Sequence, residues 1–139
     1  MAEYNEPIER INNPLQEKTF RFSVMAVNLY KYLREDMKDL VISNQLLKSG
    51  TSVCANYQEA CFSESRADRK HKASIALKET VESIYWIRLL METECDYEGL
   101  EEMLSLGNEI KHLLMASIKT MNQKIINGKD KKNGKKTKS

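Results

Sequence analysis

Helix-breaking residues are scarce in this 139-residue sequence, which has only five glycines and two prolines. It also lacks the sustained alternation of β-branched and polar residues that predicts strands. Leu, Lys, Glu, Ala and Met are abundant instead, and such a composition favours long helices. A chain of this length is expected to fold as one domain with a core of its own. We therefore predict an all-α fold.

Cysteines and long apolar runs are scarce as well. Cys54, Cys61 and Cys95 are odd in number and show no CxxC spacing, so we interpret Cys54 and Cys61 as small buried residues on one helix face. The longest apolar run, IYWIRLLM, is short and contains Arg88, so no membrane span is predicted. The first 13 residues lack the apolar core of a signal peptide. We expect a cytoplasmic protein that makes no contact with a membrane.

Positive charge is concentrated at the C-terminal end. The net charge of the chain is +2, but residues 124–139 contain seven lysines and one aspartate and carry +6, which leaves −4 on the remainder. A lysine-rich tail of this kind is expected to be disordered, and it can add salt-sensitive affinity for RNA or DNA or act only as a solubilising segment. The residues that would contact nucleic acid are Lys129, Lys131, Lys132, Lys135, Lys136 and Lys138.

Two amphipathic segments in the first half of the chain indicate helices. The first is expected over about 14–34, with Asn13 as its cap and a proline in its first turn. The second is expected over about 40–61, with Asp36 or Asp39 as its cap. The links before and after the second segment are short and polar, so the helices are expected to be neighbours in space.

The second half of the chain indicates two further helices. Ser65 and Asp68 form a capping pair that opens a third helix. The fourth is expected from about Tyr97 to Ile126, with Gly128 as its terminator. An apolar seam runs along the fourth helix through Leu100, Leu104, Gly107, Ile110, Leu114, Met121 and Ile125.

Four helices with short links predict an antiparallel up-down-up-down four-helix bundle. We assign residues 1–13 to an N-terminal arm, 14–126 to the bundle and 127–139 to a flexible lysine-rich tail.

The stretch QLLKSGTSVCANYQEA places small residues in the middle of the second helix. Glycine inside a helix costs about 1 kcal/mol relative to alanine, so a compensating close approach by another helix is expected there. The polar atoms on this face would need partners, because an unpaired buried group costs about 1–3 kcal/mol. We predict a structural polar cluster between the second and third helices that comprises Ser49, Gly50, Ser52, Asn56, Glu59, Glu79 and Glu82.

The third helix is apolar on two sides. One stripe comprises Ala73, Ala76, Leu77, Thr80, Ile84, Ile87 and Met91, and the other Ile75, Trp86, Leu89 and Leu90. A single four-helix bundle covers only one side of each helix. We therefore predict a homo-oligomer with Ile75, Trp86 and Leu89 at a subunit interface. A partly exposed tryptophan is the alternative, since single exposed apolar residues are common.

Two short patterns in the sequence match parts of known catalytic sites. Arg66 and His71 have the Arg-x4-His spacing of HEPN-type helical ribonucleases, in which Arg stabilises the developing charge and His moves a proton. Glu109 and His112 form one Glu-x-x-His pair of the kind found in di-metal bundles, and Asp68 with His71 is an imperfect second pair. We expect His112 to point outward. Such short patterns specify little, so we predict no catalytic residues, no metal and no cofactor.

Three segments carry a family resemblance: LYKYL, QLLKSGTSVCANYQEA and ESRADRKHKASIALKETVESIYWIRLL. They resemble the bacterial four helix bundle protein family, whose founding members are encoded in intervening sequences of 23S ribosomal RNA genes. Related members include the accessory variability determinant of diversity-generating retroelements. The resemblance covers about residues 15–120, and Arg69 departs from it because an aromatic or aliphatic residue is expected there.

The resemblance implies a bundle that assembles into a ring, with five subunits the expected number and no established enzymatic activity. In the retroelement branch the ring is basic and partners a reverse transcriptase and nucleic acid, whereas the body of this chain is acidic. We predict an oligomeric scaffold or binding module that contacts RNA, DNA, a ribonucleoprotein or a reverse transcriptase. The alternative is an enzyme, either a HEPN-like ribonuclease using Arg66 and His71 or a di-metal carboxylate protein.

Overall fold

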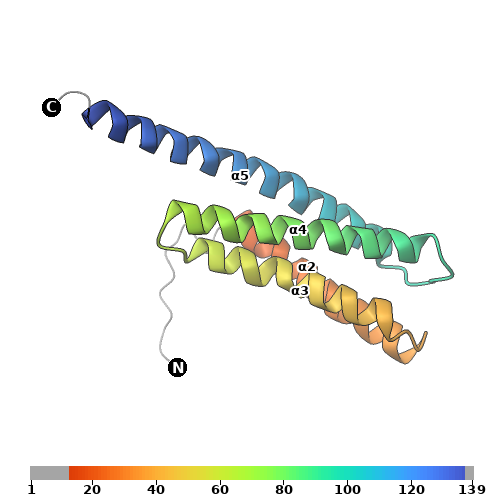
Figure 1. Cartoon of the computed structure of the whole chain (residues 1–139). Coiled ribbons are helices and arrows are strands. Elements are labelled where there is room, and N and C mark those ends of the chain that lie inside the picture. The colour runs from red at the N-terminus through yellow and green to blue at the C-terminus, as the bar shows by residue number, and fades with distance from the viewer. Residues whose placement is uncertain (1–12, 137–139) are drawn as a thin grey trace.

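A computed structural model describes the backbone of residues 13–136 and the side chains of residues 13–128. Helices account for nearly all of this range (Figure 1). They are α2 (Pro14–Glu35), α3 (Val41–Cys61), α4 (Arg66–Met91) and α5 (Leu100–Lys136). The all-α fold that was predicted from the composition is confirmed.

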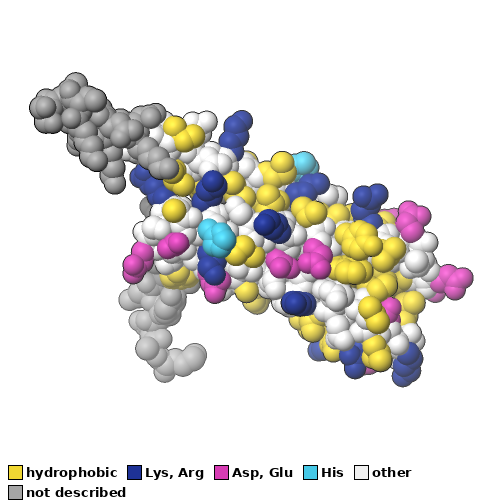
Figure 2. Space-filling view, viewed as in Figure 1, with side chains coloured by type: hydrophobic (Ala, Val, Ile, Leu, Met, Phe, Trp, Pro, Cys, Tyr) yellow, Lys and Arg dark blue, Asp and Glu magenta, His cyan; other side chains and the backbone are white. Residues whose placement is uncertain are grey.

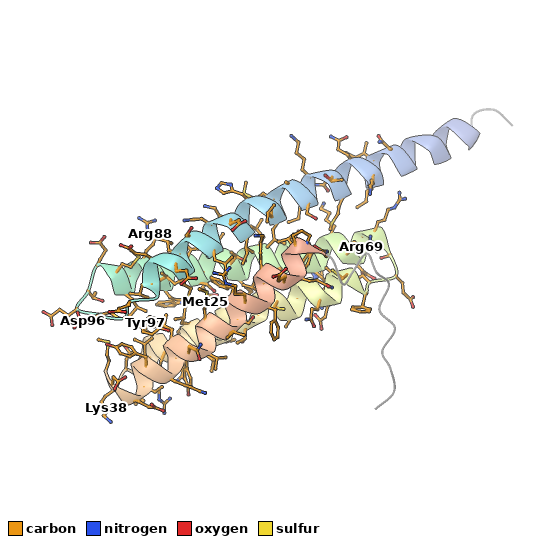
Figure 3. The ribbon with its side chains drawn as sticks, turned by 180° about the vertical axis from the view of Figure 1, so that it is seen from behind. Met25, Lys38, Arg69, Arg88, Asp96 and Tyr97 are labelled. Carbon is orange, nitrogen blue, oxygen red and sulfur yellow. The ribbon has the colours of Figure 1, made fainter. Side chains whose placement is uncertain are left out.

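Each helix packs against its neighbours in the sequence, and α5 also packs against α2. The four helices therefore form a closed bundle in which α2 and α4 occupy opposite corners, as do α3 and α5. This is the predicted up-down-up-down arrangement. Figures 1 and 3 show that the C-terminal part of α5 continues past the ends of the other helices and diverges from them.

The predicted caps are present at the starts of three helices. The side-chain oxygen of Asn13 accepts a hydrogen bond from the Leu15 backbone N–H at 3.0 Å, so it caps α2. Asp39 accepts from the N–H groups of Ile42 and Ser43 at 2.8 and 3.2 Å, which identifies it as the cap of α3. Ser65 accepts from the Asp68 N–H at 3.0 Å at the start of α4. Each cap satisfies a backbone donor that the helix leaves unpaired.

The predicted bounds of the last helix are wrong at both ends. α5 begins at Leu100 because Tyr97 belongs to the preceding link, where its ring packs against that of Tyr32 with centroids 5.1 Å apart. At the other end the helix continues through Gly128 to Lys136. Gly128 has an ordinary negative φ, and no proline follows it to stop the helix.

The predicted boundary between bundle and tail at residue 126 therefore lies within α5, and residues 127–136 are helical rather than irregular. Five of the six predicted nucleic-acid-binding lysines lie in the range where only the backbone is described. Lys138 and the arm before Asn13 lie outside the described residues.

The core lies along the inner faces of all four helices. Its largest fully buried apolar side chains are Phe22, Leu29, Leu33, Leu46, Val53, Ile87, Met103, Ile110 and Leu114. The α5 seam is covered by the other helices as far as Leu114, whereas Met121 and Ile125 are only half-buried because α5 has by then diverged. On α4, Leu90 is buried and Met91 is exposed, so the predicted assignment of these two residues was reversed.

The three cysteines are free thiols, with Cys54 buried and the other two half-buried. Burial raises the pKa of Cys54, so its thiol stays protonated. None of the described helices combines the length and apolar character that crossing a bilayer requires.

Candidate functional site

The small residues of α3 allow α2 to approach very closely. Gly50 is buried, and a Cβ atom added there would lie 2.5 Å from the Cβ of Ala26. Non-bonded carbon atoms do not lie that close, so a side chain at this position would require the two helices to shift apart. In addition, Ser23 of α2 donates a hydrogen bond to the Gly50 carbonyl at 3.2 Å. The close approach that was predicted from the sequence is present, and α2 is the helix that makes it.

A hydroxyl pair joins α3 to α4 on the other side of α3. The Ser83 hydroxyl is 2.9 Å from the Ser49 hydroxyl, and both side chains are buried. Ser83 also lies 2.8 Å from the Glu79 carbonyl, while Ser49 donates to the Leu46 carbonyl at 3.4 Å. These contacts satisfy two polar groups that would otherwise destabilise the core.

The other polar residues of the predicted cluster are more dispersed. Ser52 donates to the Lys48 carbonyl at 2.6 Å, and Asn56 donates to the Ser52 carbonyl at 2.8 Å, so both bond within α3. Glu59 pairs with Lys72 of α4 at 3.1 Å. The α3 hydroxyl of Ser49 is thus bonded across the α3–α4 seam by Ser83 rather than by Glu79 or Glu82.

The two glutamates of α4 lie near each other rather than on the α3 hydroxyls. Burial raises the pKa of Glu79, the neighbouring Glu82 raises it further, and Lys48 opposes both effects. Glu82 is exposed and accepts a hydrogen bond from the indole N–H of Trp86 at 3.4 Å. These contacts orient the tryptophan at the surface of α4.

An apolar face lies over the C-terminal half of α4, where Figure 2 shows hydrophobic side chains gathered. Val81 and Tyr85 are 50% and 57% exposed. The rings of Tyr85 and Trp86 meet edge to face at a centroid distance of 4.9 Å. The three predicted interface residues, Ile75, Trp86 and Leu89, are half-buried on this helix. We call Val81, Tyr85, Trp86 and Leu89 the α4 face.

A groove of about 530 Å³ lies beside the α4 face, between α4 and α5. Its apolar wall includes Val81, Tyr85 and Leu89, and its polar wall includes Arg88, Glu92 and Lys111. The groove is therefore apolar along the α4 face and charged along its other wall.

A second apolar face lies on α2. Phe20 is 61% exposed and Val24 is 44% exposed, and four-residue spacing places them on one side of the helix. Because α2 and α4 occupy opposite corners of the bundle, the α2 face and the α4 face point away from each other.

The two catalytic patterns are not assembled into sites. Arg66 donates to the Lys124 carbonyl at 3.3 Å and lines a cavity that His71 does not line. Five residues on a helix correspond to a rotation of about 140°, so Arg66 and His71 lie on different sides of α4.

The di-metal pattern is equally dispersed. His112 is exposed, as predicted, and Glu109 pairs with Lys18 at 2.7 Å. Within the described part of the chain, no three His, Cys, Asp or Glu side chains lie close enough together to hold a metal ion.

Comparison with known proteins identifies the family of this chain. The chain matches the 23S rRNA-intervening sequence protein family over residues 12–116. The chain belongs to this family. The matched residues include the α2–α3 seam and the α4 face and end before the C-terminal part of α5.

A solved structure supports the same assignment. The chain is similar to a protein of unknown function from the S23 ribosomal protein family of Bacteroides thetaiotaomicron VPI-5482. The two are 44% identical with a TM-score of 0.73, and the match covers 76% of this chain and 98% of the other. No curated protein matches the chain. The family resemblance drawn from the sequence motifs is confirmed.

Three features were not predicted from the sequence: the hydroxyl contact of Ser83, the exposed ring of Tyr85 and the cavity beside Arg66. The burial of Ser83 could have been predicted, because it lies three residues after Thr80 and four before Ile87 on the buried side of α4. The place of Tyr85 on the α4 face could also have been predicted, since it lies four residues from Val81 and from Leu89. The cavity beside Arg66 could not, because it depends on where α5 diverges.

Proposed function

We propose that this family member is a non-enzymatic scaffold that assembles with copies of itself into a closed ring. The observation that carries the proposal is the pair of exposed apolar faces on α2 and α4. Contiguous exposed apolar surface on a soluble domain marks an interaction site. The α4 face supplies an aromatic pair and a groove, and the α2 face supplies Phe20 and Val24 as apolar residues to fill it.

The positions of the two faces favour a ring over a two-fold dimer. A two-fold interface uses the same patch on both subunits, whereas two different patches joined head to tail generate a ring when the rotation closes. The α2 and α4 faces are on opposite corners of the bundle, so each subunit can contact two neighbours. Five subunits is the number that the family resemblance implies.

Solution mass tests the assembly. A subunit has a mass of 16.1 kDa, and light scattering behind size exclusion should give about five times that value for a pentamer. Tyr85→Glu should break the α4 face and Phe20→Glu the α2 face, so each variant alone should be monomeric. Gln45→Glu adds the same charge at an exposed polar position on α3 and should leave the mass unchanged.

Mixing the two face variants tests the head-to-tail geometry. Tyr85→Glu keeps an intact α2 face and Phe20→Glu keeps an intact α4 face, so the mixture should contain a heterodimer with one intact interface. A Phe20→Glu variant that still dimerises alone would indicate pairing of two α4 faces and would contradict the ring. A monomeric wild type would remove the scaffold proposal altogether.

The lysines at the end of α5 extend the proposal to nucleic acid. The last 16 residues carry a net charge of +6, and lysine–phosphate contacts produce a steep loss of affinity with salt. Removing residues 128–139 should weaken RNA binding and reduce its salt dependence. Unchanged affinity in the truncated chain would exclude these lysines from the function.

A further inference from the structure

A cavity of about 560 Å³ lies at the end of the bundle where α5 diverges from the other helices. The end of α3 contributes Tyr57 to its wall, the first turn of α4 contributes Arg66 and Arg69, and α5 contributes Lys124. Figure 3 labels Arg69 at this end of the molecule and Arg88 at the opposite end of α4. The cavity is therefore distant from the α4 face.

The charge on the cavity wall is of one sign. Arg66, Arg69 and Lys124 line it, and no Asp or Glu does. The ion pairs between described residues join Lys18 to Glu109, Arg21 to Glu102 and Lys72 to Glu59, so none involves the three cavity cations. Arg66 and Lys124 are solvent-exposed and Arg69 is half-buried, and an anion in a space lined by three cations and no carboxylate would be attracted to all three.

Arg69 carries the strongest single indication. Its Nε atom is buried and has no hydrogen-bond partner among the described residues. A buried donor on a charged group is costly to leave unpaired, and each such case in a native structure calls for an explanation. An oxygen atom of an anion in the cavity would supply the acceptor that Nε needs.

The remaining wall is uncharged and combines polar side chains with the apolar Ala60 and Met121. Tyr57 is 5% exposed, and its hydroxyl accepts a hydrogen bond from Asn13 at 2.7 Å. Burial, together with the nearby Cys61, raises the pKa of Tyr57 to about 12, although Arg69 and the Asn13 hydrogen bond oppose the shift. The phenol therefore stays neutral at physiological pH and adds no negative charge beside the cations. Ser117 and Thr120 of α5 place hydroxyl-bearing side chains on the opposite wall.

We infer that this cavity binds a phosphate group, held by the guanidinium groups of Arg66 and Arg69 and the ammonium group of Lys124. Two guanidinium forks match the oxygens of a phosphate in pairs, and lysine adds a point charge. The N-terminal end of α4 adds a partial positive charge. The volume exceeds that of a phosphate ion and falls within the range of small-molecule pockets. The group is carried either by a nucleotide-sized molecule or by an RNA backbone.

Calorimetric titration of the full-length protein separates these two carriers. One arm uses uridine 5′-monophosphate, with uridine as its unphosphorylated control. The other uses a ten-residue RNA with a 5′-hydroxyl, whose only phosphates are in the backbone. Binding in the first arm identifies a free phosphorylated molecule. Binding only in the second identifies the backbone if Arg69→Gln weakens it, since the lysines at the end of α5 are also proposed to contact RNA. An absence of binding in both arms overturns the inference.

Arg69→Gln tests the assigned residues, because glutamine removes the charge and keeps a polar side chain. It should weaken whichever probe binds by about tenfold or more, as expected for the loss of a charge-assisted contact. Arg34→Gln is the control. It removes an arginine from the last turn of α2, whereas the cavity lies at the start of that helix beside Asn13, and it should leave the affinity unchanged. Equal affinities for wild type and Arg69→Gln would overturn the assignment.

Stability without a ligand separates a binding role from a structural one. Because Arg69 Nε has no partner, Arg69→Met should unfold at the same or a higher temperature than wild type in chloride, and should gain nothing from the bound probe. A lower unfolding temperature in chloride would show that Arg69 holds the fold together instead. The inference does not rest on assembly, so the mass of Arg69→Gln should equal that of wild type whether or not the ring forms.

Discussion

At the α2–α3 seam, the Cβ of Ala26 occupies the space that any side chain on Gly50 would need, whereas a cavity of about 560 Å³ opens between α4 and α5. The seam is lined by small side chains and the cavity by long cationic ones. Close packing fixes how two helices fit together and leaves no room for a ligand. Where α5 diverges, the helices are not closely packed, and a space lined by polar and cationic side chains remains between them. One region of the bundle specifies its fold, and the other is available for binding.

Substitution of Gly50 should have the largest effect. Gly50→Ala should lower the free energy of unfolding by about 1–3 kcal/mol, since overpacking outweighs the gain of about 1 kcal/mol in helix propensity. Gly50→Val should cost more than about 3 kcal/mol because its branches meet the backbone of α2. Chemical denaturation measures both.

The compensating variant Ala26→Gly supplies the control for this prediction. Alone it should cost about 1 kcal/mol through helix propensity, but in combination with Gly50→Ala it should restore much of the lost stability. Additive losses in the double variant would show that the two positions do not touch, and the tight seam would then be wrong.

Alkaline pH should lower the stability of the fold through Tyr57, which forms part of the cavity wall. Its pKa is about 12 in the folded chain against 10.0 when unperturbed. The folded state therefore retains the proton longer than the unfolded state, and the resulting stability is present below pH 10 and lost as the pH rises towards 12. The loss should approach about 1.4 kcal/mol per pH unit in that window.

Tyr57→Phe tests this source of pH dependence. It should be less stable than wild type at pH 8, because the Asn13 hydrogen bond is lost, and should show a shallower decline above pH 10. Tyr85→Phe removes one exposed tyrosine and should keep the slope of wild type. If the stability of wild type and Tyr57→Phe declined with the same slope above pH 10, the desolvation of this phenol would be contradicted.

The hydroxyl pair between α3 and α4 should contribute less. Ser83→Ala removes the hydroxyl that faces Ser49 and should cost about 1 kcal/mol. Ser49→Ala should cost less, because Ser83 keeps the Glu79 carbonyl at 2.8 Å as a partner. Since the two residues share one contact, the double variant should cost less than the two single variants together. A strictly additive result would show that the hydroxyls do not interact.

The smallest effect should have the opposite sign. Gly128 lies in the diverging part of α5, and a Cβ there would meet only an Arg66 nitrogen at 3.7 Å. Gly128→Ala should raise the free energy of unfolding by up to about 1 kcal/mol through helix propensity. A loss of stability would show that the end of α5 is as closely packed as the α2–α3 seam.

The fold was largely predictable because its signals are local. Asn13, Asp39 and Ser65 are capping residues whose bonds involve only the next few residues. Asn13 and Ser65 were predicted as caps, and Asp39 was one of the two candidates for the second helix. The need for glycine at position 50 was also readable, because a helix-breaking residue inside a helix requires a packing reason. The end of α5 was misplaced because Gly128 breaks a helix only when its φ is positive, and sequence does not report φ.

The cavity was not predictable, for a different reason. Arg66, Arg69 and Lys124 are separated by up to 58 positions along the sequence, and they meet only because α5 crosses the start of α4 at an angle. Helix periodicity shows which residues share a side of one helix, but it does not give the angle between two helices. Arg69 was noticed only as a departure from the family pattern.

Because α5 is long, a small rotation of the helix displaces its C-terminal end by several ångströms. Gly107 lies buried between Phe22 and Ile84, and about 44 Å of helix separates it from Lys136 at 1.5 Å per residue. A rotation of α5 by about 10° around Gly107 would move Lys124 by about 4 Å and Lys136 by about 8 Å. An anion that drew Lys124 towards Arg69 would therefore move the lysine-rich end about 1.7 times as far.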